Sequence, residues 1–380
     1  MLVICGMTVP SLVRRFFPLL LMFAIFSLAG CATTHRAGKL LAPTDQNRFY
    51  KSRDYGTERQ FNPATEILNE GYDLLRGNGV DRRVFDLPYS EEATNLRISL
   101  FNPGKTWRMY GGTRLSTHEL FPLSLKSGGG GQWVPNYEFH LIGSGMVSAR
   151  MAEWFDARSV PHPVLMSALT MTAAHFLNEM TERPVKFSED AITDLLIFDP
   201  AGLLLFRLNA VQKFFSGPAQ LTNWPLQPVL TFPEKTLENV GQEFVLRVKV
   251  PGSERWKFMY IFGVASFLGA SRDIGNGRSI SFGAGVNAEV KILNVETDAR
   301  TVELTPTAGV FYDREGSLLV SLVGRSGVEN HASLNVYPGT AIGRRLPFGF
   351  WLSTGRGGKP RLGLVSSWGV GIASGPSRAH

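Results

Sequence analysis

Cysteine is almost absent from this chain, which has two, Cys5 and Cys31, among 380 residues. Both stand within the first 31 residues, so the rest of the sequence cannot form a disulfide, a thiolate metal site or a cysteine nucleophile. Stability of the remaining chain must therefore come from burial and hydrogen bonding.

Other features are also missing. Charged residues make up only 19% of the chain, and the net charge of +7 is spread without a dense Lys/Arg block among aromatics. A nucleic-acid partner is therefore not expected. No nucleotide-binding glycine loop or serine nucleophile elbow occurs in a fitting context, and no segment after residue 31 has the length and apolarity of a spanning helix.

The N-terminus carries a secretory pattern. Arg14 and Arg15 precede an apolar run from Phe16 to Phe26, and Ser27-Leu28-Ala29-Gly30-Cys31 follows. Leu28–Cys31 resembles the lipobox of bacterial lipoproteins, which implies removal of residues 1–30 and lipidation of Cys31. A transmembrane helix is the alternative, but the apolar run is shorter than the roughly 20 residues needed to span a bilayer. Because Ala32 rather than aspartate follows Cys31, we expect anchoring in the cell outer membrane, at the periplasmic leaflet.

The second half of the chain alternates between apolar and polar or small residues. From Ser279 to Leu293 the even positions are apolar, and the odd positions hold Ser, Gly, Asn, Glu and Lys. This pattern predicts a long strand with two unlike faces. It recurs over 301–313 and 362–372, and further strands are predicted at 243–250, 256–268, 317–325, 331–337 and 346–354.

Two architectures fit these strands. The first is an antiparallel outer-membrane-type β-barrel of about 8–10 strands with associated helices, because strands this long match the roughly 9–11 residues that cross a bilayer at a tilt. The second is a soluble periplasmic β-sandwich or partly open barrel. The predicted fold class is thus mainly β with a helical module.

Five regions follow from the pattern: a signal peptide at 1–30, a lipidated polar tether at 31–65, a mixed segment with strands at 66–135, a helical module at 136–230 and the β region at 231–380. Within them, Asn62-Pro63 predicts the start of a short helix, and 94–114 reads as strand-like. Helices are predicted over 143–155 and 163–181. A third is capped by Ser188 and ends near Phe198, because Asp199-Pro200-Ala201-Gly202 reads as a turn.

The segment Asn136–Phe206 is the most motif-like. It contains His140, Gly143-Ser144, Ala149-Arg150, a small-residue helix with Glu179, and Ser188-x-Asp190 followed by Asp194-Leu195. This series resembles a family of uncharacterised Gram-negative outer-membrane proteins. The resemblance implies a membrane barrel with embedded helices and no assigned activity. The sequence departs from the pattern at Phe206-Arg207, where an acidic residue often follows the glycines.

One polar cluster is predicted on the helices. His175, Glu179 and Glu182 lie at i, i+4 and i+7 and so share one helix face, where Asp190 and Asp194 can join them. Three interpretations stay open: a structural network involving His140, Arg150, Ser188 and Asp190, acid–base catalysis by His175, Glu179, Glu182 and Asp194, or a hard divalent cation. The network is preferred, and no metal or cofactor is expected.

A second candidate is His331-Ala332-Ser333. His-x-Ser on a barrel strand resembles the lipid A deacylases of the outer membrane, in which a histidine held by a glutamate activates the serine. In that family the acid follows the serine, but no Asp or Glu follows Glu329 here. A solvated strand face is the simpler interpretation.

The sequence therefore predicts a lipid-anchored outer-membrane protein without enzymatic activity, which serves envelope structure, lipid or small-solute handling, or a partner surface. Its expected partners are outer-membrane lipid, lipopolysaccharide or other envelope proteins. The alternative is an envelope hydrolase acting on lipid A, phospholipid or glycan.

Overall fold

The β region forms a single sheet of thirteen strands in the computed structural model. The structure describes residues 47–73, 82–121, 133–182, 186–263, 265–294, 299–326, 330–340, 347–355 and 360–374. The predicted signal peptide and the predicted lipidation site Cys31 lie outside these residues. The strands are β1 (Thr222–Asn223), β2 (Val229–Phe232), β3 (Leu237–Glu238), β4 (Glu243–Lys249), β5 (Trp256–Gly263), β6 (Ala265–Gly275), β7 (Arg278–Asn294), β8 (Ala299–Arg314), β9 (Ser317–Arg325), β10 (Asn330–Val336), β11 (Phe348–Gly355), β12 (Pro360–Ser366) and β13 (Gly371–Ser374).

Strand order follows the chain from β4 to β13, with β1 beside β4 and β2–β3 beside β13. The predicted strands at 279–293 and 301–313 are confirmed as β7 and β8. The single strands predicted at 256–268 and 362–372 are wrong, because each region holds two strands. The neighbours pair antiparallel except β13 and β2, which are parallel, so the sheet is mixed rather than purely antiparallel. The pairings run from β1 at one edge to β3 at the other.

The two faces of the sheet differ in exposure. One row of residues, paired strand to strand from β4 to β12, is apolar throughout: Val248, Phe258, Ala270, Phe282, Val310, Leu322, Leu334, Leu352 and Leu362. Seven of these nine side chains are exposed, including Phe258 and Leu362. The opposite face is buried and mixed. It holds polar residues such as Ser271 and Asn335 and the Arg247–Asp313 ion pair, among apolar core residues such as Phe267 and Phe311.

The helices precede the sheet in the chain. Their bounds are α2 (Gly56–Gln60), α3 (Pro63–Gly71), α4 (Tyr89–Phe101), α5 (Pro103–Tyr110), α6 (Gly112–Arg114), α7 (Gly145–Asp156), α8 (Pro163–Glu182), α9 (Glu189–Thr193), α10 (Asp199–Leu205) and α11 (Asn209–Ser216), with π-helical turns η3 (Leu115–Leu120), η4 (Trp133–Ser144) and η5 (Asp194–Phe198). No helix among the described residues is both long enough and apolar enough to cross a bilayer.

Two predictions about the N-terminal half are wrong. The strand-like segment 94–114 is helical, because Glu92, Leu96 and Ser99 recur at three- and four-residue spacing and are the buried side of α4. The described part of the predicted polar tether is packed: Phe49 and Tyr50 belong to the core, and α2 contacts β9. The predicted start of a helix at Asn62-Pro63 is confirmed, since the Asn62 side chain accepts hydrogen bonds from the first turn of α3.

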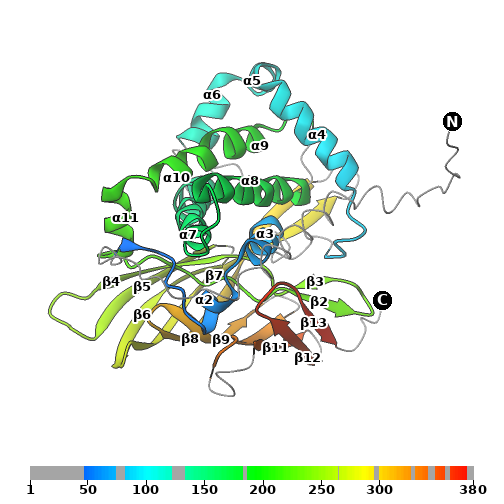
Figure 1. Cartoon of the computed structure of the whole chain (residues 1–380). Coiled ribbons are helices and arrows are strands. Elements are labelled where there is room, and N and C mark those ends of the chain that lie inside the picture. The colour runs from blue at the N-terminus through cyan, green and yellow to red at the C-terminus, as the bar shows by residue number, and fades with distance from the viewer. Residues whose placement is uncertain are drawn as a thin grey trace, which may run out of the picture. The chain divides into compact units, whose positions relative to one another are not determined.

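Figure 1 shows the helices on one side of the sheet, with α2 against the strands and α4 to α6 farthest away. The largest core cluster joins the two layers, because Met146, Met151 and Phe155 of α7 pack with Phe244 of β4 and Phe262 of β5. The two layers therefore share this core cluster.

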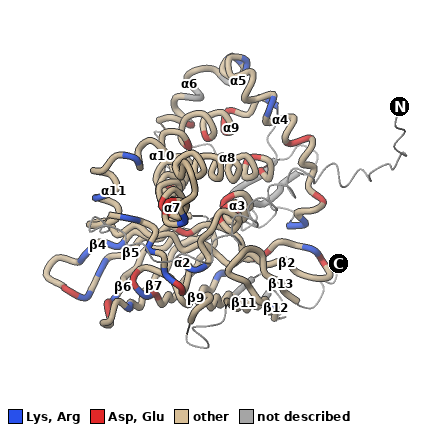
Figure 2. Tube along the Cα trace, in the orientation of Figure 1, with Lys and Arg blue, Asp and Glu red and all other residues tan. Residues whose placement is uncertain are grey.

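Most of α8 is drawn without charge in Figure 2, since its charged residues are Glu179 and Glu182 near the C-terminal end.

Candidate functional site

The candidate site lies inside the helical layer, and α8 supplies its first member. His175 lies on the buried side of α8 and is 4% exposed. This side packs against α3, where Asn178 and Thr181 donate hydrogen bonds to the carbonyls of Glu70 and Gly71. These bonds satisfy carbonyls at the end of α3 that have no intrahelical partner. They also hold the Glu70 side chain beside His175.

Asp199 reaches the site because α10 approaches η4 very closely. A side chain at Gly202 would place its Cβ 2.7 Å from the Leu141 carbonyl oxygen and 2.9 Å from that of His140. Only glycine allows this approach. It sets Asp199, the first residue of α10, against His140 of η4.

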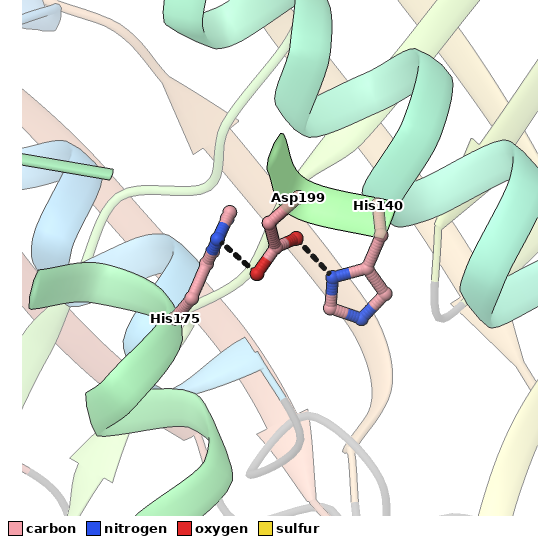
Figure 3. A group of neighbouring side chains, drawn as sticks. All are labelled: His140, His175 and Asp199. Carbon is pink, nitrogen blue, oxygen red and sulfur yellow. Dashed lines mark hydrogen bonds and ion pairs between the residues drawn. The ribbon is translucent and has the colours of Figure 1, made fainter. Parts of the chain in front are cut away.

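Asp199 bridges the two histidines, as Figure 3 shows. Its Oδ1 lies 2.7 Å from His140 Nδ1, and its Oδ2 lies 2.5 Å from His175 Nδ1. The imidazole rings are tilted by 72° with centroids 5.7 Å apart. All three side chains are at most 10% exposed, so water contributes little to their solvation.

The outer nitrogen of each ring meets another carboxylate. His140 Nε2 is 3.4 Å from Asp194 Oδ2, and His175 Nε2 is 3.2 Å from Glu70 Oε1. Ser144 donates its hydroxyl proton to the same Glu70 oxygen. A continuous chain of contacts thus runs from Ser144 through Glu70, His175, Asp199 and His140 to Asp194.

Electrostatic interactions determine which side chains in this series of contacts carry protons. Burial lowers the pKa of His175, but Asp199 and Glu70 outweigh burial and raise this pKa to about 9. The same balance raises the pKa of His140, because Asp194 and Asp199 face it. Burial also opposes ionisation of Asp199, yet the two histidines hold the pKa of Asp199 below its usual range. At neutral pH the centre is an Asp199 carboxylate between two imidazolium rings.

An acidic group adjoins the chain at Asp194. Burial, together with the charges of Glu182, Asp194 and Asp190, raises the pKa of Glu179 well above its usual range. Burial also raises the pKa of Asp194, and the neighbouring His140 partly offsets that rise. Glu179 and Asp194 therefore share one electrostatic environment with His140, whereas the partners of His175 are Asp199 and Glu70. Glu182 and Asp190 act on Glu179 and Asp194 through their charges.

Two predicted network members lie elsewhere. Arg150 pairs with Glu58 of α2 at 2.6 Å and stacks over Phe61, so it joins α7 to α2 instead of entering the histidine cluster. Ser188 caps α9 as predicted, because its hydroxyl accepts the Ala191 N–H. The predicted turn at Asp199 is wrong: η5 follows α9 directly and continues into α10, with Pro200 near the start of α10.

The second candidate, on β10, can be described at Ser333 alone. The Ser333 hydroxyl accepts a hydrogen bond from the Trp351 indole N–H at 3.0 Å. The His331 side chain lies outside the described residues. The Ser333 hydroxyl is therefore held by a neighbouring strand.

The chemistry of the histidine cluster follows from its contacts. Ser144 donates to a carboxylate and not to a histidine, so it is not part of a serine–histidine pair. The arrangement suits a buried network that holds α3, α8, η4 and α10 together. His140, His175 and Asp199 also form a possible metal-binding group, because one donor atom from each lies within 4.8 Å of the others.

Sequence reasoning missed Glu70, Ser144 and Asp199 as site members. A signal for Glu70 existed, since Glu66, Asn69, Glu70 and Asp73 form a polar stripe at i, i+3, i+4 and i+7. All four are buried, and Glu66, Asn69 and Asp73 accept hydrogen bonds from Gln242 and Gly241 beside β4. Asp199 gave no such signal, because its Asp-Pro-Ala-Gly context is typical of a turn.

Comparison of the chain with protein-family models, with curated proteins and with solved structures finds no match.

Proposed function

We propose that this chain is a lipid-anchored outer-membrane protein whose sheet is inserted in the bilayer as a barrel wall, with the helical layer as a cap or plug. Its role is non-enzymatic, in envelope structure or in handling lipid or a small solute. The single observation that carries the proposal is the exposed apolar row of the sheet. This row runs through nine consecutive strands and seven of its nine side chains are exposed, whereas serine, asparagine and an Arg–Asp pair are buried among apolar residues on the other face.

Exposure of this apolar row is favourable in lipid and unfavourable in water. Apolar surface exposed to water is unfavourable by roughly 25 cal/mol per Å², and soluble proteins rarely expose apolar patches beyond a few hundred Å². In a bilayer the same row contacts acyl chains, as the outward apolar band of a membrane barrel does. Cys31, as a lipidated residue, would add an anchor at the periplasmic leaflet.

A cavity supports the handling of small solutes. A space of about 260 Å³ lies between the helices and the polar sheet face, and Arg150 of α7, Arg247 of β4 and Lys257 of β5 line it together with Glu58 and Asp313. Its mixed charges favour water or a small polar solute over an acyl chain.

The test removes the lipid without removing export. A Cys31→Ser chain is placed behind a cleavable secretory signal that carries no lipobox, and the cells are fractionated. We expect the protein in outer membranes, resistant to alkaline carbonate extraction, because the strands themselves insert. The chain with Cys31 and its own signal is the matched control. Recovery of the variant in the soluble periplasm would contradict the barrel and favour a tethered soluble sheet.

A further inference from the structure

The two histidines of the cluster are oriented as metal ligands. Both turn the same nitrogen, Nδ1, towards Asp199, and the three donor atoms lie within 4.8 Å of one another. They come from three separate segments, η4, α8 and α10, as Figure 3 shows. A convergent set of two imidazoles and one carboxylate is the donor set that Zn²⁺ and related divalent transition metals prefer.

The surroundings of each ring strengthen this interpretation. Histidine ligands of metals usually hold their second ring nitrogen against a carboxylate, which fixes the ring and increases its basicity. Here His140 Nε2 faces Asp194 and His175 Nε2 faces Glu70. Each of these carboxylates also has one buried oxygen without a hydrogen-bond partner, Asp194 Oδ1 and Glu70 Oε2. Three buried carboxylates around two imidazoles provide the negative charge that offsets a dication.

We propose that His140, His175 and Asp199 bind one divalent transition-metal ion, with Zn²⁺ as the representative, and that Asp194 and Glu70 orient the two histidines. Zinc–ligand distances of roughly 2.0–2.2 Å place two donors of one ion about 3 Å apart or slightly more. The present Nδ1–carboxylate contacts are 2.5 and 2.7 Å, so Asp199 must withdraw by less than about an ångström to admit the ion. The expectation of a site without metal is revised accordingly.

Such an ion would cross-link η4, α8 and α10, because it would be bound by one residue of each. The binding free energy at a buried structural site adds to the stability of the folded state. The inference does not depend on the membrane proposal, because the site lies within the helical layer.

The experiment measures metal in untagged full-length protein purified in detergent. The protein is stripped with a chelator, incubated with Zn²⁺ or Mg²⁺, freed of excess ion and analysed by mass spectrometry. We expect stoichiometric Zn²⁺ and background Mg²⁺, because imidazole is a poor ligand for Mg²⁺. His140→Asn, His175→Asn and Asp199→Asn should each reduce bound Zn²⁺ to background. His162→Asn, at an exposed histidine just before α8, should retain it.

A graded response separates ligands from orienting residues. Asp194→Asn and Glu70→Gln should weaken Zn²⁺ binding by about 10- to 100-fold without abolishing it. X-ray absorption spectroscopy of the zinc-loaded wild-type protein does not depend on whether any variant folds. We expect its spectrum to show nitrogen and oxygen ligands with imidazole scattering. Background zinc in the wild-type protein, equal zinc in the wild-type and His175→Asn proteins, or a zinc spectrum without imidazole would each overturn the proposal.

Discussion

At the scale of single residues, buried polar side chains determine how this protein responds to solution conditions. Glu66 of α3 is fully buried, and one carboxylate oxygen accepts a hydrogen bond from Gln242 at 2.7 Å while the other has no partner. Burial raises the pKa of Glu66 to about 7, and Arg150 and Gln242 only partly offset this effect. Because the folded state disfavours the carboxylate, the free energy of unfolding should fall as pH rises from about 4.5 through about 7.

The Glu66→Gln variant tests this linkage. A glutamine oxygen can still accept from Gln242, but the group no longer ionises, so the variant should lose this part of the pH dependence. Relative to the wild-type protein it should gain stability with rising pH, reaching about 3 kcal/mol above pH 7. Urea unfolding in detergent, followed by tryptophan fluorescence between pH 4 and 8, measures the difference. Glu91→Gln, at an exposed position of α4, is the control. Parallel pH profiles for the wild-type and Glu66→Gln proteins would contradict the assignment.

At the scale of elements, long periodic segments were predicted well in both classes of structure. The helices predicted over 143–155 and 163–181 are confirmed as α7 and α8, and the strands predicted over 279–293 and 301–313 are confirmed as β7 and β8. Alternation over 279–293 predicted β7 because its period of two persists for many residues, and no helix buries such a pattern. The segment 94–114 misled because Leu96, Ile98 and Leu100 alternate only briefly, while α4 buries residues at helical spacing. A local sequence pattern is enough to predict a long strand with two unlike faces. The formation of a helix without a strong periodic pattern depends on tertiary contacts, which the local pattern does not contain.

The apolar row makes a prediction that depends on depth. Val310→Lys places a charge in the row between Phe282 and Leu322, and in a bilayer it should cost about 2–4 kcal/mol. Tyr312→Lys lies on the same face of β8 but nearer the turn at Glu315, and near the interface it should cost about 0–1 kcal/mol. Urea titration of protein folded into liposomes, read by heat-modifiable gel migration, compares the two. Equal stabilities, or improved solubility of Val310→Lys without detergent, would favour a sheet exposed to water.

At the scale of the whole molecule, the sequence predicted the two classes of structure but not how they join. Periodicity separated the helical and β regions, and the histidine-bearing face of α8 was predicted from spacing alone. The partners of that face, Glu70 and Asp199, come from segments interpreted as a short isolated helix and a turn. Only tertiary packing brings them together. α3 approaches α8 closely at Gly71, and α10 approaches η4 closely at Gly202.

The junction of β13 with β2 should contribute strongly to overall stability. Val229 of β2 and Ala373 of β13 form a buried cluster with Trp351 and Val365. Deleting residues 367–380 removes β13 and should lower the temperature at which the protein loses its heat-resistant gel migration. Deleting only 375–380 leaves every described pairing in place and should have little effect. If both deletions behave like the full chain, the β13–β2 pairing contributes little.

The β13–β2 pairing also constrains the order of assembly. β2 is synthesised before the long hairpins, yet its neighbour β13 is the last strand described, so the sheet cannot be completed until nearly the whole chain has been made. Pairings between distant segments form slowly. During this delay the apolar row is exposed on unfinished strands, which are prone to aggregate. Under the proposal of an exported, membrane-inserted sheet, we therefore expect the folding yield to depend on a chaperone that holds the chain before insertion.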